Sequence, residues 1–298
     1  QQFKINKQMK ILVTFCSAIF LFVSCNPEPQ NKNLTYQNII IISDMSSRLN
    51  NKPPKDIDEI NKIVNFFKTE CVKPGKKIGD RSSISFSPFS QKTITSIDLE
   101  KYKNLSEKQS FINSTGKYRN NGLAQQINIF KNKVESAYSN TRNQGLDLIS
   151  ILIEKIENEN IIKSDTTFIN GIDTTFIKYD NHIYIFTDGY LEYNNRNRNN
   201  QFYFSNSEID KVRQFSKTNN IDVSKALEAK SSLGLPSEKN NKNHHINLHI
   251  FETHERDKDD KLQTYKYPKG QRDNEILQAV WKKWTSESGF KSFEWKKY

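Results

Sequence analysis

Two aspartates that each follow an apolar run are the residues best placed to do chemistry. Asp44 and Ser46 form a D-x-S turn directly after the isoleucine-rich run 38–43. Asp188 stands in the tripeptide T-D-G after a second apolar run, 182–187. Open α/β sheets bind their ligands beyond the carboxyl ends of the strands. Carboxylates and hydroxyls gathered there, with few soft ligands, suit a hard divalent cation such as Mg²⁺ or Mn²⁺.

A third segment is expected to reach the same place. Thr141 opens the loop T-R-N-Q-G-L-D-L-I, which leads into a helix whose apolar positions run from Leu146 to Ile156. In a sheet of strand order 3-2-1-4-5-6, the strands that precede Asp44 and Asp188 are neighbours, so their terminal loops face one crevice. The sequence therefore predicts a metal site formed by Asp44, Ser46, Thr141 and Asp188.

The elements that must position this site alternate along the chain. Apolar runs typical of buried strands alternate with stretches of helical periodicity, which predicts a doubly wound, mostly parallel six-stranded sheet with helices on both faces. Asn170-Gly171 lies between two copies of D-T-T-F-I, which predicts an inserted β-hairpin over 164–178. Strands are expected at 38–43, 81–89, 93–97, 182–187, 246–251 and 290–295, and helices at 56–67, 123–138, 146–156, 207–218, 223–231 and 273–287.

The order of these motifs resembles a von Willebrand factor A-type domain. The shared features are an apolar strand with D-x-S, a threonine loop opening a G-L-D-L helix, and an apolar strand with T-D-G. The resemblance covers roughly Tyr36 to Trp295 and implies a Rossmann-like fold. It also implies a metal-ion-dependent adhesion site, in which Asp44, Ser46, Thr141 and Asp188 hold the ion and an acidic group of a protein partner completes the coordination.

Arg48 departs from that pattern. The family motif is D-x-S-x-S, and Arg48 stands where the second serine belongs, with Ser47 beside it. Its guanidinium would neutralise Asp44 or Asp188 and leave a metal-free site, or it would face solvent or form a salt bridge elsewhere. The sequence leaves both a metal-binding and a metal-free site open.

The first residues have the composition of an export signal. Lysines precede Met9, an apolar run follows from Ile11 to Val23, and Ser24-Cys25 ends it. The segment resembles a bacterial lipoprotein signal, which implies cleavage before Cys25, acylation of its sulfur and a place in the cell envelope. We expect a signal peptide at 1–24, with 1–8 upstream of a start at Met9, a lipidated tether at 25–35 and one domain over 36–298.

Composition limits the other function classes. The formal net charge is +11, but the basic residues are spread along the chain, so specific nucleic-acid binding is not expected. Neither G-x-G-x-x-G nor G-x-x-x-x-G-K-[ST] occurs, which removes the usual support for dinucleotide and P-loop nucleotide binding. Cys71 is expected to be a structural thiol, since the mature chain has no second unmodified cysteine to pair with it.

Three functions follow from these features. The favoured one is a lipid-anchored, non-enzymatic binding module that engages a protein through the adhesion-type site. The second is a metal-dependent hydrolase that uses Asp44 and Asp188 as ligands, with His182 or His254 as acid/base. The third is a structural scaffold without metal. Zinc binding by His244, His245 and His249 is not expected, because His245 and His249 lie far apart along one strand.

Overall fold

The computed structural model describes residues 31–46, 53–75, 80–140, 145–171, 173–193, 201–252, 255–259 and 261–298. The chain divides into two compact units. The larger unit comprises Thr35–Asp165 and Lys178–Tyr298, and the smaller one contains Thr166–Ile177 together with the N-terminal residues through Leu34.

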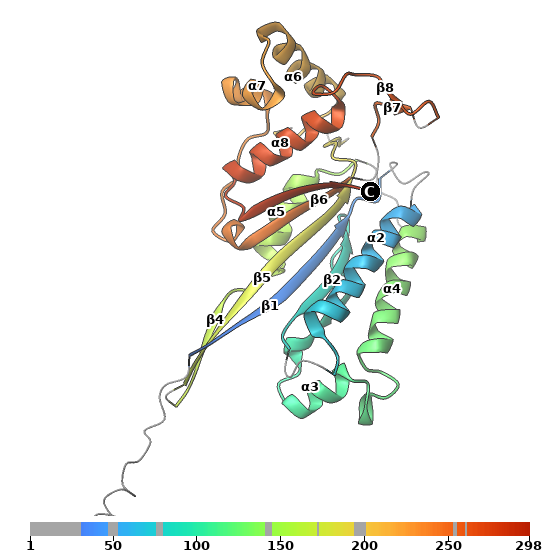
Figure 1. Cartoon of the computed structure of the whole chain (residues 1–298), viewed down its shortest axis with the longest axis vertical. Helices are drawn as coiled ribbons and strands as arrows, with labels where there is room; N and C mark the ends of the chain where they lie inside the picture. The colour runs from blue at the N-terminus through green and yellow to red at the C-terminus, as the bar shows by residue number, and fades with distance from the viewer. Residues whose placement is uncertain are drawn as a thin grey trace, which may run out of the picture. The chain divides into compact units, whose positions relative to one another are not determined.

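A mostly parallel sheet carries the larger unit (Figure 1). Its strand order is β3-β2-β1-β5-β6-β9, in which β3 alone runs antiparallel to its neighbour among the register pairs assigned. The side chain of Asn38 bonds to that of Asn181, and the Asp44 N–H donates to the Phe186 carbonyl, so β1 and β5 also run in the same direction. The strands are β1 (Asn31–Ser43), β2 (Ser83–Pro88), β3 (Thr95–Asp98), β5 (Asp173–Thr187), β6 (Ile246–Glu252) and β9 (Ser292–Lys297).

The four isoleucines of β1 explain why helices cover both faces. Successive side chains of a strand point to opposite faces. Ile40 and Ile42 belong to one hydrophobic core, and Ile39 and Ile41 to another. The first core contains residues of α5 (Leu148–Asn158), α6 (Asn206–Asn219), α7 (Val223–Ala229) and α8 (Asp273–Glu287), and the second those of α2 (Pro53–Phe66), α3 (Leu105–Ile112) and α4 (Leu123–Asn140). The predicted α/β class with helices on both faces is therefore observed.

Several boundaries differ from the prediction. β1 begins at Asn31, within the segment expected to be a tether. α2 begins at Pro53 rather than after Asp56, since proline suits the first turn of a helix. Asp56 is instead buried and accepts hydrogen bonds from the hydroxyls of Tyr138 (2.8 Å) and Tyr298 (2.9 Å).

The sequence does not predict three short elements. These are the helix α3 and the paired strands β7 (Lys258–Asp259) and β8 (Thr264–Tyr265).

The smaller unit contains the predicted hairpin. β4 (Thr166–Asn170) pairs antiparallel with the first residues of β5, from Asn170↔Asp173 to Thr166↔Ile177. Asn170 is therefore a strand residue rather than part of the turn. Gly171 has φ +63°, the conformation that favours glycine at such a turn.

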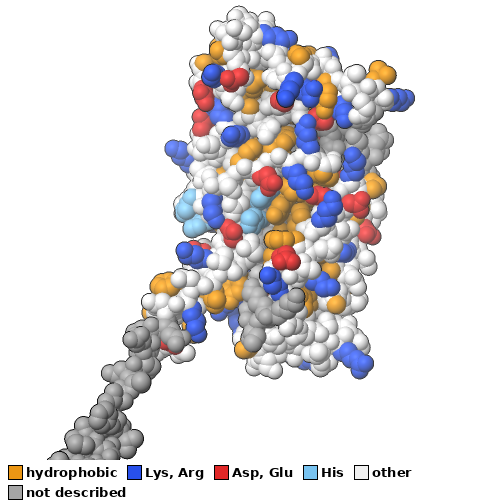
Figure 2. Space-filling model, in the orientation of Figure 1, with side chains coloured by type: hydrophobic (Ala, Val, Ile, Leu, Met, Phe, Trp, Pro, Cys, Tyr) orange, Lys and Arg blue, Asp and Glu red, His pale blue; other side chains and the backbone are white. Residues whose placement is uncertain are grey.

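The surface carries mixed charge. On the face drawn in Figure 2, Lys and Arg side chains are interspersed with Asp and Glu rather than gathered in one block. Among the described residues, no helix is long and apolar enough to cross a membrane.

Candidate functional site at the ends of β1 and β5

Strands β1 and β5 are neighbours in the sheet, as the sequence predicts. The Asp44 N–H donates to the Phe186 carbonyl at 2.9 Å, and Phe186 lies two residues before Asp188. The two acidic turns therefore leave the sheet side by side. This is the point where chain connections depart to opposite faces of the sheet, and such a switch point opens a crevice.

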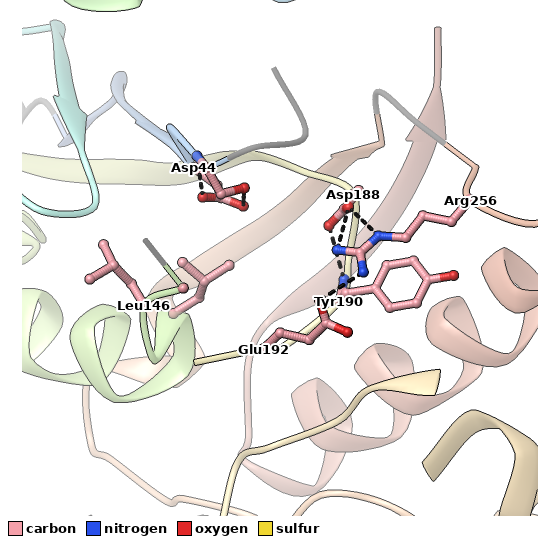
Figure 3. A pocket seen from close by; sticks show the side chains of 9 residues that line it. Asp44, Leu146, Asp188, Tyr190, Glu192 and Arg256 are labelled. Atoms are coloured by element: carbon pink, nitrogen blue, oxygen red, sulfur yellow. Dashed lines mark hydrogen bonds and ion pairs between the residues drawn. The ribbon is translucent and has the colours of Figure 1, made fainter. Parts of the chain in front are cut away.

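A cavity of about 190 Å³ occupies this crevice (Figure 3). Asp44, Ser46 and Asp188 all line it, so three of the four predicted site residues lie together. Thr141 lies outside the described residues, as do Ser47 and Arg48. The other lining residues are Gly145, Leu146, Leu148, Tyr190, Glu192 and Arg256.

Asp44 and Ser46 form a turn in which Ser46 donates two hydrogen bonds to the Asp44 carboxylate. The Ser46 N–H donates to Asp44 Oδ1 at 3.0 Å, and the Ser46 hydroxyl donates to Asp44 Oδ2 at 3.0 Å. Such bonds from a position two residues later are the usual reason that aspartate begins a turn. Both side chains line the cavity, so a carboxylate and a hydroxyl oxygen are held together at its wall.

Asp188 is held differently, by Arg256. Its Oδ2 accepts from Arg256 Nε and lies 2.9 Å from Nη2 as well, while Arg256 Nη1 reaches Glu192 at 2.7 Å. Asp188 is almost completely buried, and a buried carboxylate requires a compensating charge. Figure 3 shows the guanidinium between the two carboxylates, on the opposite side of the cavity from Asp44.

The electrostatics of Arg256 follow from that position. Burial alone would lower the pKa of Arg256, but the charges and hydrogen bonds of Asp188 and Glu192 outweigh it and raise this pKa above its ordinary value. The guanidinium also stacks on the ring of Tyr190, 3.8 Å from its centroid. Arg256 is thus a permanent cation fixed by two carboxylates and an aromatic face.

Helix α8 supports the loop that carries Asp188 and Tyr190. The Tyr190 hydroxyl donates to Asp273 Oδ2 at 2.7 Å, and Trp281 Nε1 donates to the Gly189 carbonyl at 2.9 Å. Burial, together with this bond to Asp273, raises the pKa of Tyr190 well above its usual range. The phenol therefore stays protonated and serves as a fixed support.

The donor set fits a hard cation only in part. Asp44 and Ser46 supply the oxygen ligands that Mg²⁺ prefers, whereas Asp188 is already neutralised by Arg256. Within the described ranges, no group of three or more histidine, cysteine, aspartate or glutamate residues is arranged to hold a metal ion. A metal at this site would therefore depend on Asp44 and Ser46, with Asp188 contributing only if Arg256 moves away.

The predicted acid/base histidines lie elsewhere or outside the described residues. His182 lies five residues before Thr187 on β5, about 17 Å away at the rise of a strand. Its Nδ1 is 2.9 Å from Nε2 of His249 on β6. His254 lies outside the described residues, and none of the described residues that line the cavity is a histidine.

Sequence reasoning missed Arg256, Glu192 and Tyr190. Glu192 and Tyr190 follow T-D-G in the sequence, and Arg256 follows β6, the strand beside β5. The polar residues that follow β6 could have indicated Arg256, because β6 ends at the same edge of the sheet as β1 and β5. The hydrolase hypothesis uses His254, two residues before Arg256 in the same segment.

Neither a protein-family model nor a curated protein sequence matches this chain.

Proposed function

We propose that this chain is a lipid-anchored binding module with a von Willebrand factor A-like fold, which engages a protein partner at the cavity between Asp44 and Asp188. The observation that carries the proposal is the convergence of Asp44, Ser46 and Asp188 on one cavity at the switch point of the sheet. The order β3-β2-β1-β5-β6-β9 matches the order 3-2-1-4-5-6 of the six predicted strands and supports this fold.

The charges of the cavity favour a cationic ligand. Its described lining includes three carboxylates, of Asp44, Asp188 and Glu192, and one guanidinium, of Arg256. Asp44 lies across the cavity from Arg256. Mg²⁺ or Mn²⁺ held by Asp44 and Ser46 would polarise and bind an acidic side chain of the partner, and no bond would need to be broken.

The anchor in this proposal is Cys25, which lies outside the described residues. Acylation there would hold the module at the bacterial cell envelope. The partner's identity is open, and the mixed surface charge seen in Figure 2 gives no support for a nucleic acid.

The metal part is tested by thermal unfolding of the purified chain in millimolar Mg²⁺ or Mn²⁺ and in EDTA. An ion that binds only the folded chain, at 100 times its Kd, adds about 2.7 kcal/mol of stability. We expect a higher Tm with the ion, and loss of this increase in Asp44→Asn. Asp58→Asn, on the exposed side of α2, makes the same charge change away from the cavity and should keep the increase.

Arg256→Gln provides the opposite test. Removing the guanidinium lowers basal stability but frees the Asp188 carboxylate for the ion, so the increase in Tm caused by Mg²⁺ should become larger. If neither the unmodified chain nor Arg256→Gln responds to either ion, the metal-free scaffold is the better interpretation. A separate experiment captures the partner from the native envelope. If the partner binds through the metal, both EDTA and Asp44→Asn should abolish the capture.

A further inference from the structure

The repeat in the smaller unit places apolar side chains on both faces of a hairpin. Each copy reads D-T-T-F-I, starting at Asp165 and at Asp173. The register pairs Phe168 with Thr175, and Thr167 with Phe176. Residues paired across two strands share a face, and so do residues two positions apart. Phe168 and Ile177 therefore share one face, while Ile169 and Phe176 share the other.

These side chains are unusually exposed. Phe168 is 58% exposed, Ile169 70% and Phe176 39%, and Leu34, in the same compact unit, is also 39% exposed. They are four of the seven large apolar side chains that the described chain exposes. The other three lie apart from one another in the sequence: Phe66 in α2, Leu105 in α3 and Leu262 in the turn between β7 and β8. Apolar side chains reach the surface of this strand pair in Figure 2, and such a concentration usually marks a contact site.

Little charge opposes the transfer of this hairpin into an apolar medium. Asp173, beside the turn, is the single charged residue in the sequence from Thr166 to Ile177. The backbone N–H and C=O groups of β4 that face β5 are paired within the hairpin. An antiparallel pair with apolar side chains on both faces can therefore enter the interface of a bilayer at low desolvation cost.

We propose that the β4–β5 hairpin inserts its apolar side chains into the surface of the lipid bilayer to which Cys25 is anchored. This inference rests on the lipidation of Cys25 given under the proposed function. Cys25 is six positions from Asn31, the first residue of β1, and six peptide units span at most about 20 Å. Asn31 and the hairpin belong to one compact unit, so a bilayer holding the acyl chains lies within reach of that unit.

The geometry assigns the hairpin a role besides anchorage. A flexible acyl tether alone leaves a domain free to rotate above the membrane. A second contact, made by Phe168, Ile169 and Phe176, restricts the rotation of the smaller unit at the membrane surface. The partner chemistry is a phospholipid headgroup and acyl boundary, not a second protein.

The test uses the mature, lipidated chain in phosphatidylethanolamine/phosphatidylglycerol vesicles. Ile169→Cys is labelled with an environment-sensitive fluorophore, since the buried Cys71 is shielded and Cys25 is acylated. The matched control is Leu262→Cys, which is 71% exposed and lies in the larger unit. At position 169 the emission should shift to shorter wavelength and lose most of its intensity with brominated acyl chains. The label at position 262 should keep its emission in water.

Two further variants complete the design. Adding Phe168→Asp and Phe176→Asp to the labelled chain should return the emission at position 169 to its value in water. An unchanged thermal transition would show that the fold is kept. A label at position 169 that stays water-exposed in vesicles, or that responds only when a second protein is added, would overturn the inference.

A separate measurement distinguishes a missing lipid on Cys25 from a failure of the hairpin to contact the bilayer. Palmitate incorporation, and its loss in Cys25→Ala, reports on lipidation alone. If Cys25 carries no lipid, the same label in the Cys25→Ala chain mixed with vesicles still decides the question. Quenching by brominated lipid supports bilayer contact by the hairpin, and lack of quenching overturns it.

Discussion

Gly189, between Asp188 and Tyr190, has no room for a side chain. Its φ is +84°, and a Cβ atom built there would lie 2.6 Å from Cη2 of Trp295. Its carbonyl accepts the Trp281 indole hydrogen bond. The turn that aims Asp188 at the cavity is therefore packed directly against β9 and α8, and its backbone needs glycine.

Alanine at Gly189 should destabilise the fold more than alanine at Gly270. Both glycines have nearly the same φ, +84° and +85°, but a Cβ at Gly270 meets nothing within 4 Å. The left-handed conformation costs about 1–2 kcal/mol at either position. The overlap with Trp295 adds about 1–3 kcal/mol at Gly189 alone. Urea unfolding of Gly189→Ala and Gly270→Ala measures the difference, and equal losses would show that Trp295 moves aside.

At this scale the sequence predicts only the residues next to the strands. Asp44, Ser46 and Asp188 directly follow apolar runs, so strand adjacency is enough to bring them together. Arg256 could not be assigned in this way. Arg256 pairs with Asp188 because its long side chain points toward that carboxylate and because Asp188 is buried. Neither property produces a periodic pattern in the sequence. The sequence suggests such a neutralisation by Arg48, which lies outside the described residues, and the structure places the guanidinium of Arg256 on Asp188.

Among the elements, α5 shows how a capping residue decides what lines the cavity. The sequence pattern includes Leu146 in the helix, but α5 begins at Leu148 because Asp147 caps it. Asp147 Oδ1 accepts the Ser150 N–H at 3.1 Å, and Oδ2 accepts the Ser150 hydroxyl at 2.6 Å. Leu146 therefore stays outside the helix and lines the cavity with Gly145.

Removing the cap should destabilise α5. Asp147→Ala leaves the first N–H groups of the helix without their acceptor and should cost about 1 kcal/mol of unfolding free energy, within the range 0.5–2. Asp147→Asn keeps an acceptor oxygen and should retain most of the stability. Chemical denaturation of the two variants checks this. If Asp147→Asn loses as much unfolding free energy as Asp147→Ala, the effect comes from the negative charge at the start of the helix and not from the capping hydrogen bond.

Periodicity predicts the long elements well and the short ones poorly. α4 and α8 carry regular apolar positions over several turns and are found close to their predicted ranges. α3 spans only Leu105–Ile112, and its sequence L-S-E-K-Q-S-F-I has too few apolar residues to show a period. It is helical because Asn104 caps it and because Phe111 and Ile112 join the core.

For the whole molecule, the sheet also holds partly buried ionisable groups on the neighbouring strands β5 and β6. His182 on β5 and His249 on β6 bond to each other at 2.9 Å, and Tyr184 stacks on His249. Asp180 lies 3.4 Å from His182, and Glu294 lies 2.5 Å from His249. Lys291 pairs with Asp180 at 2.7 Å and adds a positive charge near His182.

Burial is the largest influence on both histidines and lowers the pKa of each below 6.5, although Asp180 and Glu294 act to raise these values. The unfolded chain therefore takes up protons that the folded chain resists once the pH falls below about 6.5. Stability contributed by the neutral pair is complete above that pH and is lost as the pH falls toward the lowered values. The bond between the two rings gives a further reason, since a second proton would place two donors face to face.

Unfolding free energy should accordingly decrease between about pH 6.5 and pH 5, before ordinary carboxyl groups begin to titrate. Replacing both rings, in His182→Gln/His249→Gln, should flatten this pH dependence. His244→Gln, which changes an exposed histidine, should leave it unchanged. Urea denaturation at a series of pH values measures the slope, and an equal slope in the double variant and the unmodified chain would assign the acid sensitivity to other groups.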